Sequence, residues 1–76
     1  MFKAIIITSN NTLFAGEAWS VFLPGITGEF EVLDLHAPIV SLLKKGKIIV
    51  NGQNRIPIKR GAVRMAGDEL VAVVEE

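Results

Sequence analysis

Few side chains in this sequence could carry out acid–base or metal chemistry, and they gather in one short segment. The single histidine, His36, follows Asp34 by two residues, and Glu29 and Glu31 precede both. Asp34 and His36 could form an acid–base pair. Catalysis also needs a nucleophile and an oxyanion site in a concave pocket, and neither a Ser-His-Asp nor a paired-carboxylate spacing occurs. A small hydrolase that uses His36 and Asp34 is therefore the weakest hypothesis.

A metal site would need further oxygen or nitrogen ligands beside these four residues, and there is no cysteine to supply a thiolate. We therefore predict no metal, no cofactor and no catalytic residue, and we interpret His36 as a structural or contact residue. The chain is predicted not to be an enzyme.

The basic residues are unevenly distributed, although the formal net charge is zero. The stretch from residue 44 to residue 64 contains no acid and seven of the eight cations: Lys44, Lys45, Lys47, Arg55, Lys59, Arg60 and Arg64. Proteins that bind single-stranded nucleic acid interleave cations with aromatic side chains, and this stretch has none. We expect either an electrostatic surface for an acidic protein or simply solvated strand edges, and binding of nucleic acid through residues 44–64 is the alternative.

Turn signals at intervals of six to twelve residues separate short segments rich in β-branched residues, which predict strands. No window shows a helical period free of glycine or proline. The expected strands cover residues 2–8, 17–23, 29–33, 39–43, 47–50, 55–59, 62–66 and 69–75. These eight segments do not fill the whole chain, and we expect residues 1–76 to form a single all-β domain of about nine or ten short strands, arranged as a two-sheet β-sandwich or flattened barrel.

The turns carry further expectations. Asn51-Gly52 is a strong hairpin signal, and Lys44-Lys45-Gly46 is expected to be a second tight hairpin. Pro24-Gly25 is expected to end a strand, Pro57 to lie on an edge strand, and Gly67-Asp68 to separate the last two strands. Some of the large apolar residues at turns or on second strand faces are expected to form an exposed patch for a partner: Leu13, Phe22, Leu33 and Leu35.

Three short motifs carry a family resemblance. They are Phe14-Ala15-Gly16-Glu17, the pair Gly28-Glu29, and His36-Ala37-Pro38, whose histidine follows Glu29 by seven residues. Apolar strands follow at residues 46–50 and 70–75. With this order and spacing the sequence resembles the epsilon subunit of the F-type rotary ATP synthase over essentially its whole length.

The resemblance implies a two-sheet sandwich at the foot of the central stalk, on the cytoplasmic face of the bacterial inner membrane. The chain would be a non-catalytic subunit that couples the γ subunit to the membrane ring of c subunits during proton-driven ATP synthesis. It further implies that Gly28 and Glu29 contact the c ring, that Thr8, His36 and Ser41 lie toward γ, and that no cofactor or nucleic acid is bound.

Two features depart from the family pattern. Asp34-Leu35 stands where the family usually has Pro-Gly, and because glycine permits positive φ, Leu35 implies either a different turn or a strained one. The chain also stops at Glu76, before the helical pair of most members, so we expect neither self-inhibition by an extended arm nor ATP binding.

Overall fold

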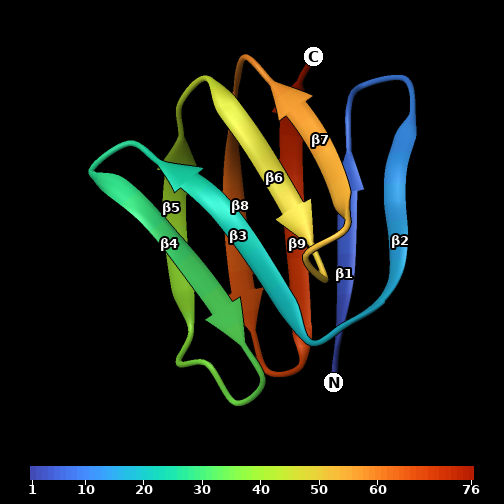
Figure 1. Cartoon of the computed structure of the whole chain (residues 1–76), viewed down its shortest axis with the longest axis vertical. Helices are drawn as coiled ribbons and strands as arrows, with labels where there is room; N and C mark the ends of the chain where they lie inside the picture. The colour runs from blue at the N-terminus through green and yellow to red at the C-terminus, as the bar shows by residue number, and fades with distance from the viewer.

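The computed structural model describes all 76 residues and consists of nine strands without a helix (Figure 1). The strands are β1 (Phe2–Ile7), β2 (Thr12–Ala18), β3 (Ser20–Gly25), β4 (Gly28–Leu33), β5 (Ile39–Leu43), β6 (Gly46–Val50), β7 (Asn54–Ile58), β8 (Arg60–Ala66) and β9 (Glu69–Glu75). The predicted all-β class and the number of strands are therefore confirmed.

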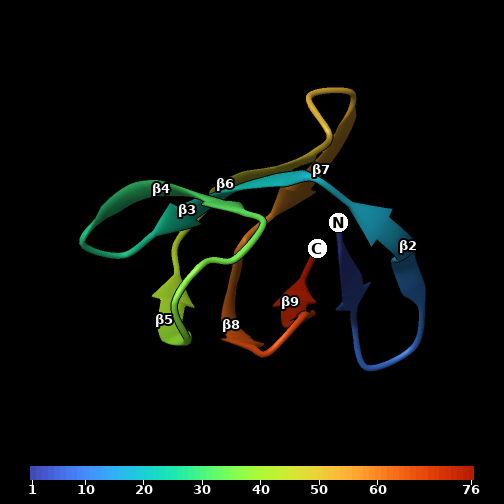
Figure 2. The ribbon, with the colours of Figure 1, turned by 90° about the horizontal axis from the view of Figure 1, so that it is seen from below.

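The strands form two layers that share one hydrogen-bonded path, β2-β1-β9-β8-β5-β3-β6-β7, with β4 added to β3. Strands β2, β1, β9, β8 and β5 make one layer, and β4, β3, β6 and β7 make the other (Figure 2). Pairing passes from one layer to the other between β3 and β5, through the pair Gly25 and Leu43. All pairs are antiparallel except β1 with β9.

The core lies between the two layers and follows the period-two alternation of strands. In β8, Val63 and Met65 are buried while Arg64 between them is exposed. Sixteen apolar side chains make one cluster, among which Ile6, Leu23, Ile48, Met65 and Leu70 are the largest that are fully buried. Both layers contribute to it, so each sheet buries its apolar face against the other.

The expected hairpin at Lys44-Lys45-Gly46 is wrong, because β5 pairs with β8 and not with β6. Leu43 pairs with Gly61, and three residues later Gly46 pairs with Ile58, so the two ladders keep one register. Residues 39–50 and 54–65 are therefore a single long hairpin. Residues 44–45 and 59–60 form a bend where it passes from one layer to the other.

Close packing at this bend depends on two glycines. A Cβ atom on Gly61 would lie 2.7 Å from the carbonyl oxygen of Val73, and one on Gly46 would lie 2.8 Å from Cβ of Pro24. Neither approach leaves room for a side chain. The bend is thus set by backbone contacts with other strands, which local sequence does not reveal.

Two further expectations fail around Trp19. The sequence predicts one strand over residues 17–23, whereas the chain breaks at Trp19 into β2 and β3, and β2 extends back to Thr12. Pro24 does not end a strand: β3 continues to Gly25, and the carbonyl of Pro24 accepts a hydrogen bond from the N–H of Lys44 (2.9 Å). Pairing with β1 and β5 overrides the local signals.

The remaining turn predictions are confirmed. Asn51 and Gly52 have φ of 55° and 69°, the signs of a type I′ turn, and they join β6 to β7. Gly67 has φ of 61° in the two-residue connection of β8 to β9. Pro57 lies on β7, the last strand of the path.

Candidate interaction surfaces

Gly28 and Glu29 lie at the start of β4, after the two-residue loop that joins β3 to β4. Gly28 adopts φ of 145°, and a Cβ on Gly25 opposite it would lie 2.5 Å from its carbonyl oxygen. The hairpin tip is therefore built on glycines. Glu29 is exposed and has no cationic side chain within ion-pair distance, so its carboxylate is free to meet a cation on a partner.

The side chain of Thr8 shapes the turn between β1 and β2. Its Oγ1 accepts hydrogen bonds from the N–H groups of Asn11 (2.9 Å) and Asn10 (3.2 Å), and its own N–H donates to the carbonyl of Asn11 (2.8 Å). These local bonds order the turn and leave Thr8 half-buried.

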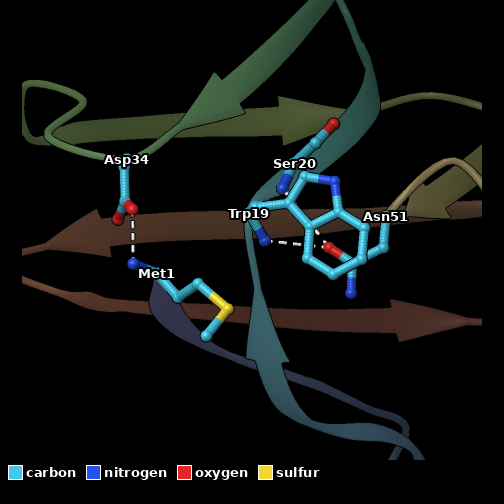
Figure 3. Close-up of polar contacts among 5 residues, drawn as sticks. All are labelled: Met1, Trp19, Ser20, Asp34 and Asn51. Atoms are coloured by element: carbon cyan, nitrogen blue, oxygen red, sulfur yellow. Dashed lines mark hydrogen bonds and ion pairs between the residues drawn. The ribbon is translucent and has the colours of Figure 1, made fainter.

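His36 lies in the loop between β4 and β5 and forms no hydrogen bond or ion pair with the carboxylate of Asp34. Its Nδ1 donates to the carbonyl of Ala37 (2.6 Å), whereas Asp34 forms an ion pair with the amino group of Met1 (Figure 3). The structure therefore does not form the acid–base pair that the sequence allowed. No three histidine, aspartate or glutamate side chains lie close enough to hold a metal ion.

The turn before His36 resolves the question raised by Leu35. The N–H of His36 donates to the carbonyl of Leu33 (3.2 Å), and Leu35 has φ of 63°. In the four-residue turn from Leu33 to His36, only the third residue, Leu35, has a positive φ. This is the arrangement of a type II turn, in which glycine is favoured at that position. The turn is thus strained by Leu35, whose side chain is 98% exposed.

Ser41 occupies the inward-facing register of β5, where it is half-buried and donates from Oγ to the carbonyl of Leu42 (3.1 Å). Its two neighbours point outward instead: Val40 is 78% and Leu42 is 59% exposed. The exposed side chains of β5 are therefore apolar.

Val40 and Leu42 belong to an apolar surface that extends across the β2-β1-β9-β8-β5 layer. Strand pairing aligns them with further outward-facing residues in two rows, Val40-Arg64-Val71-Ile5 and Leu42-Ala62-Val73-Ile7. We call these eight residues the apolar sheet face. Arg64 is its one charged member, and that guanidinium has no ion pair within the chain.

Sequence reasoning missed the apolar sheet face, although a signal was present. In β5 and β9 both alternating sets of side chains are apolar, apart from Ser41 and the terminal glutamates. Strands with apolar residues on both sides are typical of sheets covered on both faces. Of the four residues expected in an exposed patch, Leu33 and Leu35 are exposed, whereas Leu13 and Phe22 are half-buried.

The predicted contact residues do not form one compact patch. Thr8 follows Ile7 at one end of the apolar sheet face, and Ser41 lies between Val40 and Leu42. The connection from β4 to β5, which contains His36, lies at the opposite end of the sandwich (Figure 1). Glu29 belongs to the other layer.

The basic segment does not form one surface either. Lys44, Lys45, Lys59 and Arg60 lie at the bend, Lys47 lies on β6, Arg55 lies on β7, and Arg64 lies on the apolar sheet face. The cations are thus divided among several surfaces. The molecule also has no pocket.

Asn51 holds the junction between β2 and β3, a role that the hairpin prediction did not include. Its Oδ1 accepts from the N–H groups of Trp19 and Ser20 (Figure 3). Its Nδ2 donates to the carbonyl of Glu17 (3.3 Å), and its N–H donates to the carbonyl of Ser20 (2.7 Å). The residue therefore fixes the step from one layer to the other.

Comparison with known proteins places this fold in a family. The sequence profile of the family described as "ATP synthase, Delta/Epsilon chain, beta-sandwich domain" matches residues 1–76. The chain belongs to that family. The resemblance drawn from the three motifs, and the sandwich it implied, are confirmed.

Individual relatives of this delta/epsilon-family chain are ATP synthase epsilon chains. The chain is 30% identical to that of Chlorobium limicola and 34% identical to that of Chlorobaculum tepidum, and covers 90% of each. It is 35% identical to that of Sulfurimonas denitrificans but covers 59% of that longer protein. In each case at least 96% of this chain is aligned.

A solved structure shares the fold at low sequence identity. It is a chain of the central stalk and c-ring of Tetrahymena thermophila mitochondrial ATP synthase, with a TM-score of 0.81 and 8% identity, over 97% of this chain and 63% of that one. The contacts expected for Gly28, Glu29, Thr8, His36 and Ser41 remain predictions.

Proposed function

We propose that this chain is a non-catalytic central-stalk subunit of an F-type ATP synthase, which couples the γ subunit to the c ring. Its epsilon-chain relatives and a structural neighbour that comes from a central stalk and c-ring support this proposal. The observation that carries it is the apolar sheet face. A small domain that leaves so much apolar surface in water is built to cover it with a partner.

The apolar sheet face is the surface that we assign to γ. Thr8 borders it at one end and Ser41 lies beneath it, so two of the three residues expected to face γ adjoin it. Full burial of one valine or leucine side chain contributes about 1.5–3 kcal/mol, and Val40, Leu42 and Val73 are each more than half exposed. Together they would supply several kcal/mol of binding free energy.

Arg64 adds specificity to this contact. It stands between Val40 and Val71 and would be desolvated together with them. A guanidinium buried without a partner is strongly unfavourable, so γ must present a carboxylate at this point. Apolar contact would then provide affinity, and the charge pair would fix the orientation.

We assign the Gly28-Glu29 hairpin tip to the c ring. The Glu29 carboxylate is exposed and unpaired within the chain, and it projects from a tip that Gly25 and Gly28 shape. Such a group suits contact with basic polar loops, where a rim charge steers docking. The chain would reside at the cytoplasmic face of the bacterial inner membrane as part of the complex. It has no helix long and apolar enough to span the bilayer.

Nucleic-acid binding through residues 44–64 has no specific observation in its favour, because the cations are divided among several surfaces. An oligonucleotide titration at low salt, where phosphate contacts are strongest, should show no binding. Tight, salt-dependent binding there would support that alternative.

Glu29→Lys tests the ring contact. We expect the variant to fold normally and to lower proton-driven ATP synthesis in the reconstituted enzyme, because it reverses the charge at the tip. Glu31→Lys is the control on the same exposed side of β4; because it removes the hydrogen bond that Ser20 Oγ donates to Glu31 (2.7 Å), the folding of both variants is checked in parallel. Unchanged ATP synthesis with Glu29→Lys, or an equal loss with Glu31→Lys, would remove the assignment.

A further inference from the structure

The bend in the long hairpin brings cations of two strands together. Leu43 pairs with Gly61 and Gly46 pairs with Ile58, so the two residues between these pairs on each strand lie at the same bend. They are Lys44 and Lys45 on one strand and Lys59 and Arg60 on the other, and all four are exposed. We call Lys44, Lys45 and Lys59 the lysine corner.

Neighbouring acids neutralise little of this charge. Arg60 Nε lies 3.7 Å from Oε1 of Glu75, and the exposed Glu76 follows. Glu29 is the other nearby acid, because it pairs in register with Pro24, whose carbonyl accepts a hydrogen bond from the N–H of Lys44. None of the three lysines forms an ion pair. The corner therefore keeps an unbalanced positive charge on a chain whose net charge is zero.

The fold does not require cations at this position. Its geometry follows from the close approaches at Gly46 and Gly61, and like charges gathered at one bend repel each other. A cluster that costs folding stability and stays unpaired points to an anion outside the chain.

The shape of the corner indicates the kind of anion. There is no pocket to enclose a single phosphate or nucleotide, and lysines are mobile point charges on flexible stems. Such a protruding cluster suits an extended anionic surface, where each lysine close to the headgroups adds to the attraction. We propose that the lysine corner binds the anionic headgroups of a phospholipid bilayer.

This contact goes beyond the coupling role and does not depend on it. The Glu29 hairpin adjoins the corner through the bond between Pro24 and Lys44, so the same side of the sandwich would meet the ring and the surrounding headgroups. The isolated chain should nevertheless bind anionic vesicles even if the γ and ring assignments fail.

The test is co-sedimentation of the chain with vesicles of phosphatidylglycerol and phosphatidylcholine, and with vesicles of phosphatidylcholine alone. We expect salt-sensitive binding to the anionic vesicles only. The double variant Lys45→Gln, Lys59→Gln should weaken it by about tenfold or more. The control double variant Lys3→Gln, Arg55→Gln lowers the net charge equally but changes residues away from the corner, and should bind like the unmodified chain.

Each outcome decides for or against the proposal. Equal binding to both vesicle types, no binding to either, or an equal loss in both double variants would overturn it. Retention on immobilised polyglutamate without binding to anionic vesicles would also overturn it and would assign the corner to an acidic protein. Urea denaturation should show that neither double variant is less stable than the unmodified chain, because both changes remove only exposed charges.

Discussion

The side-chain oxygen of Asn51 accepts a hydrogen bond from the backbone N–H of Trp19 at 2.9 Å, and so joins the β6–β7 turn to the junction of β2 and β3. A second, longer bond of 3.4 Å comes from the N–H of Ser20. Trp19 is the residue at which the chain leaves one layer for the other. One amide side chain in a tight turn therefore fixes a step between sheets that lies 32 residues earlier in the sequence.

Replacement of Asn51 should separate its role in the turn, where it adopts a positive φ, from its role as a hydrogen-bond partner of the β2–β3 junction. Asn51→Gly keeps the positive φ and the backbone bond to the carbonyl of Ser20, but it loses the side-chain bonds to the backbone of residues 17, 19 and 20. We expect it to lower the free energy of unfolding by about 0.5–1.5 kcal/mol, the net contribution of a hydrogen bond, because Trp19 is exposed and water can reach its N–H. Asn51→Asp keeps the acceptor and should lose less than half as much. Urea denaturation measures both, and an Asn51→Gly variant as stable as the unmodified chain would contradict the role assigned to this residue.

Relief of the strain at Leu35 should stabilise the domain. A left-handed conformation costs a residue with a Cβ about 1–2 kcal/mol, and asparagine tolerates it better than leucine. Because Leu35 is 98% exposed, its replacement sacrifices no packing. We expect Leu35→Asn to raise the unfolding temperature by several degrees and Leu35→Ala, which keeps an aliphatic Cβ, to leave it almost unchanged. A lower melting temperature for Leu35→Asn in calorimetry would show that the turn is not strained.

A side chain in place of a glycine at the bend of the long hairpin should lower the stability of the domain. Gly61→Ala would place Cβ 2.7 Å from the carbonyl oxygen of Val73, and overpacking of this kind costs about 1–3 kcal/mol. Gly16→Ala is the control, because the nearest atom to its Cβ would be 3.7 Å away on Phe14. Thermal denaturation should show a clear loss for Gly61→Ala and none for Gly16→Ala. Equal effects would mean that the bend is not set by this contact.

The sequence was sufficient where structure depends on neighbouring residues. Asn51-Gly52 specifies a type I′ turn, and Pro57 specifies an edge, because each acts through its own backbone. The sequence predicts a hairpin at Lys44-Lys45, whereas the geometry there depends on the pairing of the flanking residues with Ile58 and Gly61 and on the close approach of Gly46 to Pro24. Strand β2 was predicted only from Glu17 onward, because β1 and not its own alternation holds it in the sheet.

The same distinction, between features set by neighbouring residues and features set by strand pairing, applies to the candidate surfaces. Gly28 and Glu29 could be found from a motif, because they are adjacent in the chain. The apolar sheet face could not, because Val40 and Val73 come together only through the pairing of β5, β8 and β9. A residue such as Arg64 appeared in the sequence as part of a basic segment, whereas the sheet surrounds it with apolar neighbours.

The most direct test of the stalk function is calorimetric titration of the γ subunit from the same organism with this chain. We predict a one-to-one complex that Val40→Asp weakens at least tenfold, because it places an unpaired charge in the apolar sheet face. Leu33→Asp, at an exposed apolar position on β4, should leave the affinity unchanged. No complex with the unmodified chain at micromolar concentrations would contradict the stalk function itself. A complex that Val40→Asp and Leu33→Asp affect equally would contradict the docking surface assigned to γ.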